Sequence, residues 1–196
     1  YSMLSIHKTE NVILSNLDLS NNFKFDDMVH IIYSNNISIK DSKFENSMFD
    51  AIDVDISKRI KFENLKIKNS GNDAIDSMES DLKIYNNEII NSKDKGVSSG
   101  ENSFTEIFNS LFQNNNIAIA SKDMSSVKVS NTVFKQNKIH LSSYRKNWRY
   151  NSSGKIDSII SAFDGDDKKF SSKENGMIKI SDNNSIKLIN ASNKND

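Results

Sequence analysis

A repeat of 22 to 25 residues constrains this chain more than any other feature of its sequence. Six segments follow one pattern, in which two alternating apolar residues precede an Asn or Asp and a further apolar residue follows it. The central column of this pattern is Asn16, Asp41, Asn64, Asn86, Asn109 and Asn131. A second, apolar column keeps the same step and contains Val29, Ile52, Ile75, Val97, Ile119 and Leu141. Two columns in register indicate one structural unit per repeat.

The alternation within each repeat predicts short strands joined by polar corners. Residues that alternate with period two place their apolar members on one face, which is buried only when each coil stacks on its neighbours. Helical repeats need a spacing of 3.6, and the leucine-rich frame of another repeat class is missing. We therefore predict an all-β solenoid, a right-handed parallel β-helix with about six coils. The handedness follows from the general preference for right-handed crossovers.

The predicted organisation has three parts. Residues 1–141 form the coils, and the Asn and Asp column forms a structural corner ladder, since these side chains tolerate unusual backbone angles and bond to one another. The period breaks after Leu141. We expect residues 142–189 to form a C-terminal cap or irregular last coils that cover the open end, and residues 190–196 to be a frayed tail.

Composition narrows the range of partners. The chain has 26 acidic and 26 basic residues, so we expect no bulk capture of nucleic acid. It has no apolar run of the roughly 20 residues that span a bilayer, so we expect no membrane insertion. Cysteine is absent, which excludes disulfides and thiolate chemistry. Because the chain starts at Tyr1, we expect a processed form or a fragment of a longer protein.

Carboxylates recur at equivalent positions of successive repeats. Asp53 and Asp76 directly follow members of the second apolar column and should stack. Glu79, Glu101 and Asp123 lie four residues beyond that column and should form a ladder. Like charges at this spacing raise carboxylate pKa values or attract a cation, and oxygen ligands favour Ca²⁺. The alternative is that these are solvated corner charges.

Basic residues align with the same coils. Lys95, Lys122 and Arg145 are the candidate bases of a catalytic site, with Asp53 and Asp76 as its candidate carboxylates. The corner charges are also relieved by Lys95 and Lys122. The sequence does not require any of these side chains to converge. The histidines, His7, His30 and His140, stand in unrelated local settings, and we interpret each as structural or exposed.

Residues 144–150 concentrate aromatic and basic side chains. This segment supplies the candidate ligand-binding residues Tyr144, Arg145, Trp148, Arg149 and Tyr150, and Trp148 is the only tryptophan. Aromatic faces stack on sugar rings, and Arg holds acidic groups of a polysaccharide. The alternative is a cap whose rings cover the core of the last coil.

The coils resemble the right-handed parallel β-helix proteins of the pectate lyase type. Three segments, residues 72–76, 94–101 and 119–123, are most similar to the β-helix domain attached to some bacterial spore-coat-H kinase-like proteins. The resemblance covers about residues 11–141 and includes no kinase-like portion. It implies a fold that hosts polysaccharide lyases, glycosidases and phage tailspikes, among which fold alone does not choose.

Three functions follow as expectations. The preferred one is a non-catalytic scaffold or carbohydrate- or partner-binding module of a bacterial surface or secreted protein, located outside the cell. The first alternative is a polysaccharide lyase or glycosidase. The second is a tailspike or fibre module, for which the oligomeric state is open. No cofactor is required by the sequence, and Ca²⁺ is the one that its carboxylates suit.

Overall fold

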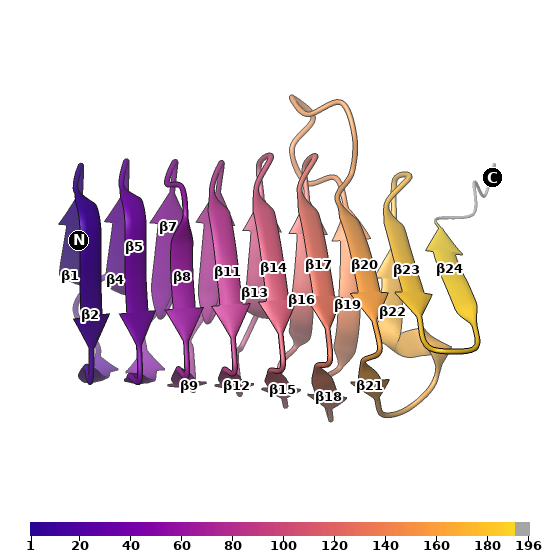
Figure 1. The fold of residues 1–196 in the computed structure, drawn as a ribbon, viewed down its shortest axis with the longest axis horizontal. Helices are drawn as coiled ribbons and strands as arrows, with labels where there is room; N and C mark the ends of the chain where they lie inside the picture. Colours follow the sequence, from indigo (N-terminus) through magenta and orange to yellow (C-terminus); the bar gives the residue numbers. More distant parts are fainter. Residues whose placement is uncertain (191–196) are drawn as a thin grey trace.

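The computed structural model describes residues 1–190 as a solenoid of about eight turns whose chain passes through three sheets, parallel except for the last strand of one of them (Figure 1). Sheet A has eight strands: β1 (Ser2–His7), β4 (Asp27–Ile32), β7 (Ile52–Asp55), β10 (Ile75–Met78), β13 (Lys95–Gly100), β16 (Ile117–Lys122), β19 (Ile139–Tyr144) and β22 (Phe170–Ser172). Sheet B has nine: β2 (Glu10–Ser15), β5 (Asn35–Lys40), β8 (Ile60–Glu63), β11 (Asp81–Tyr85), β14 (Phe104–Phe108), β17 (Ser126–Ser130), β20 (Lys155–Ile159), β23 (Met177–Ser181) and β24 (Ile186–Asn190). Sheet C has seven: β3 (Asp18–Asn22), β6 (Lys43–Ser47), β9 (Lys66–Lys68), β12 (Glu88–Ile90), β15 (Leu111–Gln113), β18 (Val133–Lys135) and β21 (Ala162–Phe163).

The core is one continuous column of apolar side chains, as the repeat predicts. Ile60 pairs with Leu82 in register, and both are buried, as is Val127 two coils further on. On sheet C the aromatic rings of Phe112, Phe134 and Phe163 stack with centroid separations of 5.4 and 4.6 Å. Each coil therefore covers the apolar face of its neighbour.

The predicted corner ladder is confirmed. All six members of the Asn and Asp column have a positive φ, between 48° and 57°. Along it Asn109 donates to Asn86 at 2.7 Å and Asn131 donates to Asn109 at 3.1 Å. Hydrogen bonds between these short amide side chains thus offset the energetic cost of the left-handed backbone.

A buried serine column, which the repeat pattern did not predict, lies at the corner between sheets A and B. Ser34, Ser57, Ser80 and Ser103 each donate a backbone N–H to the hydroxyl of the next member, which for Ser103 is Ser125, at 2.9 to 3.1 Å. These bonds satisfy backbone groups that the corner would leave unpaired. Regular spacing of serine was the available signal, although serine is common throughout this chain.

The coils continue beyond Leu141, so the prediction of six was too low. β20 pairs with β17 and β23 pairs with β20, both parallel and in register. The period breaks in sequence because a long loop follows β19 and a 3₁₀ turn, η1 (Asp167–Lys169), precedes β22. The antiparallel β24 then covers the end of sheet B. Of the expected frayed tail, residues 191–196 lie outside the described residues, while Asn190 ends β24.

Helix contributes almost nothing to this architecture. Within residues 1–190 no helix has the length and apolar character needed to cross a membrane.

Candidate functional site

The outer face of sheet A carries a concentration of ionisable side chains. Alternation along its strands sends Val29, Ile52 and Ile75 into the core, whereas the residue after each of them, His30, Asp53 or Asp76, points outward. We give the name ionisable face to these three residues together with Asp55, Lys122 and Tyr144 on the same strands and with the side chains at the starts of the strands. The residues at the strand starts are Asp27, Asp50, Asp73 and Lys95.

Lys95 is held between two carboxylates at the start of β13. Its Nζ lies 3.5 Å from Asp73 Oδ1 and also contacts the Asp94 carboxylate. Although burial opposes the charge, Asp73 and then Asp94 raise the pKa of Lys95 above its usual value. Burial raises the pKa of Asp73 to about 7, an effect that Lys95 opposes. Lys95 is therefore held as a cation between these two carboxylates.

Lys122 reaches along the face from the end of β16. Only 3 % of the residue is exposed, and its Nζ lies 3.9 Å from Asp76 Oδ1. The side chain crosses Gly100 of the neighbouring strand, where an added Cβ would lie 3.0 Å from Lys122 Cε. A residue larger than glycine would push the ammonium group away from Asp76.

His30, Asp53 and Asp55 form a second group at the other end of the face. His30 Nε2 lies 3.2 Å from Asp55 Oδ2 and 3.6 Å from Asp53 Oδ2. The hydrogen bond to Asp55 raises the pKa of His30. Burial, reinforced by Asp55 and Asp76, raises the pKa of Asp53 to about 8. A carboxyl with this pKa is protonated at neutral pH, as a general acid must be.

Tyr144 adds a phenol beside Lys122. The two residues are partners in register at the ends of β19 and β16. Burial raises the pKa of Tyr144, so its hydroxyl remains a hydrogen-bond donor. The face thus offers donors, cations and carboxyls next to one another.

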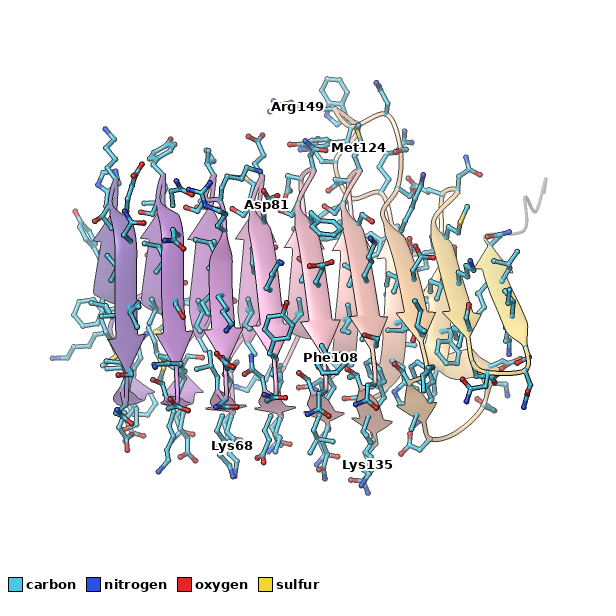
Figure 2. All side chains as sticks on the ribbon, in the orientation of Figure 1. Lys68, Asp81, Phe108, Met124, Lys135 and Arg149 are labelled. Carbon is cyan, nitrogen blue, oxygen red and sulfur yellow. The ribbon has the colours of Figure 1, made fainter. Side chains whose placement is uncertain are left out.

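The loop after β19 carries the other predicted ligand-binding residues. It projects from the solenoid (Figure 1), with Arg149 near its tip and Met124 beneath it (Figure 2). Trp148 is 82 % exposed, and the Arg149 guanidinium lies 5.8 Å from its ring centroid. The alternative that these rings cap the last core is therefore wrong for Trp148.

The base of this loop is fixed by Asp123. Its Oδ1 accepts hydrogen bonds from the backbone N–H of Lys146 at 2.7 Å and of Asn147 at 2.8 Å. Arg145 donates to Glu174 at 3.1 Å, so its charge is already paired outside the Lys95 and Lys122 group.

The predicted carboxylate ladder occupies successive corners. The backbone N–H of Glu79 donates to Glu101 O at 2.9 Å, and Glu79, Glu101 and Asp123 all have φ near 48°. Glu79 is exposed, whereas Asp123 is buried and holds the loop. Calcium binding by this ladder stays a prediction.

Several residues of the face were not among the predicted site residues. Asp27, His30, Asp50, Asp55 and Asp73 belong to this group. A signal for two of them was present, because the tetrapeptide Asp-Ala-Ile-Asp occurs at both 50–53 and 73–76. Such a repeat places two carboxyls per coil on the same outer surface.

These features define a right-handed parallel β-helix with a polar, ionisable outer sheet. The chain belongs to the right-handed β-helix family, since the family model described as "right handed beta helix region" matches residues 2–191. No curated protein matches the sequence.

Two solved structures resemble this chain, with different TM-scores. The pectate lyase pelN from Paenibacillus sp. 0602 is 8 % identical with a TM-score of 0.59, over 96 % of this chain and 71 % of that one. PfbA, a surface adhesin of Streptococcus pneumoniae, is 10 % identical with a TM-score of 0.34, over 90 % of this chain and 69 % of that one. The first likeness supports the fold.

Proposed function

We propose that this chain is a carbohydrate-binding β-helix module that holds a glycan along the ionisable face. One observation carries the proposal: two lysines and an aspartate are kept buried next to one another on the outer side of sheet A. Lys95 and Lys122 are 7 % and 3 % exposed, and Asp73 is 2 % exposed. Burial of charge is costly and is concentrated at functional sites.

The arrangement suits sugar hydroxyl groups. Carboxylates accept from hydroxyls and the partly exposed Tyr144 donates to them, while the buried Lys122 lies beside the Asp76 carboxylate. Strands about 4.8 Å apart repeat this polar pattern along the solenoid, so an extended chain of sugars can contact several coils. The exposed ring of Trp148 adds a stacking surface in the loop that follows Tyr144.

We propose that the module belongs to a bacterial surface or secreted protein, because long polysaccharide chains occur mainly outside the cell. The segments 72–76 and 94–101, which enter and form the ionisable face, also support a relation to the β-helix domains beside spore-coat-H kinase-like proteins.

Binding is tested with a panel of neutral, amino-sugar and uronate oligosaccharides, followed by calorimetry and Trp148 fluorescence in EDTA. We expect Lys122→Met and Tyr144→Phe to weaken binding at least tenfold. Lys83→Met is the matched control, since Lys83 is an exposed lysine on sheet B. Equal affinities in all three variants, or no binding by any member of the panel, would overturn the proposal.

A glycosidase or polysaccharide lyase is the second candidate, favoured by the Asp53 and Asp76 pair. These residues are partners in register on adjacent strands. Asp53, protonated at neutral pH, would act as general acid, with Asp76 beside Lys122 as the charged partner. Hydrolysis releases reducing ends alone, whereas elimination also gives an unsaturated product that absorbs ultraviolet light.

The catalytic candidate is tested by incubating the binding-positive glycan with wild type, Asp53→Asn and Asp76→Asn. Turnover that both variants lose, and that Asp81→Asn keeps, would support it. Asp81 is a suitable control because it pairs with Lys58 away from sheet A. An intact glycan after prolonged incubation with wild type would exclude catalysis and leave the binding module.

A further inference from the structure

Three side chains with metal-ligating atoms converge at the N-terminal end of the ionisable face. Asp27 and His30 come from β4 and Asp53 from β7. One carboxylate oxygen from each aspartate and one ring nitrogen of His30 all lie within 4.8 Å of one another. The fold fixes this grouping, because His30 and Asp53 are partners in register across adjacent parallel strands.

The carboxylates of this group are not neutralised by lysine, unlike those of the rest of the ionisable face. Further along, Lys95 neutralises Asp73 and Asp94, and Lys122 approaches Asp76. Among residues 1–190, no Lys or Arg lies within 4.0 Å of the Asp27 or Asp53 carboxylate. His30 is instead shared between Asp53 and Asp55. Within the described residues, the His30 imidazole is thus the one basic side chain close to the carboxyls of Asp27, Asp53 and Asp55.

The donor set indicates which cation would complete the group. Ca²⁺ takes oxygen ligands, whereas an imidazole nitrogen with carboxylates suits Zn²⁺, Mn²⁺ and related ions. Three protein ligands leave at least one position open for water or another ligand. Asp55, bonded to the same imidazole, is placed to hold the ring or to become a further ligand.

We propose that Asp27, His30 and Asp53 form a binding site for a divalent transition metal ion such as Zn²⁺. This site is separate from the Glu79, Glu101 and Asp123 ladder and differs from it in using a nitrogen ligand. It adds a fixed cation to the end of the face where lysine is missing.

The test uses the purified chain stripped with EDTA, dialysed and titrated with Zn²⁺, Mn²⁺ or Ca²⁺ by calorimetry. We expect one saturable Zn²⁺ site and binding at least tenfold weaker for Ca²⁺. His30→Ala and Asp27→Asn should each reduce Zn²⁺ affinity at least tenfold. His7→Ala is the matched control, because His7 is an exposed histidine on β1 of the same sheet.

Unfolding of the variants is checked from their melting temperatures without metal, and His30→Gln replaces any variant that does not fold. Co²⁺ added to wild type gives an independent spectroscopic sign of ligation that His30 variants should lose. No saturable Zn²⁺ binding, undiminished binding by the His30 variants, or tighter binding of Ca²⁺ than Zn²⁺ would overturn the proposal. Glycan binding is measured in EDTA, so failure of the metal site leaves the proposed function separately testable.

Discussion

Histidines in this chain show how one side chain takes opposite roles in two settings. His30 lies on the outer face of sheet A beside Asp53 and Asp55, which favour its charged form. His140 is fully buried, donating from Nε2 to Asp164 O at 2.6 Å and packing against Phe134, Phe163 and Phe170. Burial lowers the pKa of His140, whereas the hydrogen bond to Asp55 raises that of His30.

Proton NMR of the imidazole signals tests this contrast directly. We expect His30 to titrate above its ordinary value of 6.5 and His140 below it. As pH falls below 6.5, the unfolded chain then binds the His140 proton before the folded chain does, so His140 removes stability in acid. A His140 midpoint above that of His30 would contradict the assignment.

The contribution of Asp53 to folding stability depends on pH in the opposite direction from that of His140. Its pKa is about 8 in the folded chain and 3.8 ordinarily, so the folded state binds the extra proton between these values. The contribution of Asp53 to stability is therefore present below pH 3.8 and is lost as pH rises through about 8.

Asp53→Asn removes this dependence and should raise the melting temperature at pH 9. We expect a rise of at least the roughly 2–4 °C that 1 kcal/mol gives in a chain of this size, shrinking toward pH 5. Asp81→Asn, at a half-buried position on sheet B, should shift the melting temperature equally at both pH values. A decrease for Asp53→Asn at pH 9 would contradict the buried, repelled carboxyl.

At the scale of elements, corners decide where each strand ends. The amide ladder places a left-handed residue between sheets B and C in each of its six coils and bonds it to the next. Another amide ladder lies at the ends of β6, β9 and β12 of sheet C, where Asn46, Asn69 and Asn91 donate to the preceding member at 2.9 to 3.0 Å. Corners of this kind allow sharp turns without proline, which the sequence lacks.

Replacement of Asn86 separates the two contributions of a corner residue. Asn86→Ala removes the hydrogen bond from Asn109 and leaves an alanine, which has no amide to bond its neighbours, in the left-handed region at φ 56°. We therefore expect the free energy of unfolding to fall by about 2 kcal/mol. Asn86→Gly keeps the backbone unstrained and should lose about 1 kcal/mol. Urea unfolding measures both, and a glycine variant less stable than the alanine variant would refute this account.

The whole molecule depends on one core that every coil shares. Ile84 is fully buried between Phe62 and Ile107 in sheet B, with no polar partner for a charge. Its environment is repeated along the solenoid, so a defect in one coil weakens the support of its neighbours.

Ile84→Asp should destabilise the fold by several kcal/mol, about 3 or more, because it buries an unpaired charge. Ile13→Asp, at a side chain that is 70 % exposed on the same sheet, is the control and should change little. Similar urea midpoints for the two variants would mean that the sheet B column is not the core.

The repeat columns were enough to predict the sheets, the core and the amide corners, because period and alternation are local signals. Continuation of the coils past Leu141 was missed, since the loop that contains Trp148 interrupts the period without ending the stack. The position of Asp76 followed from register, but its approach by Lys122 depends on the absence of a side chain at Gly100 in another coil. Likewise, the pairing of His30 with Asp55 depends on side-chain direction, which spacing alone does not give.

Glycan binding on the outer face of sheet A is the proposed property on which the function of this chain depends. NMR chemical-shift mapping of the 22.2 kDa chain with a saturating oligosaccharide tests it most directly. We predict shift changes at Lys95, Lys122 and Tyr144 and in the loop at Trp148. Changes confined to sheets B and C, with these residues unaffected, would contradict it.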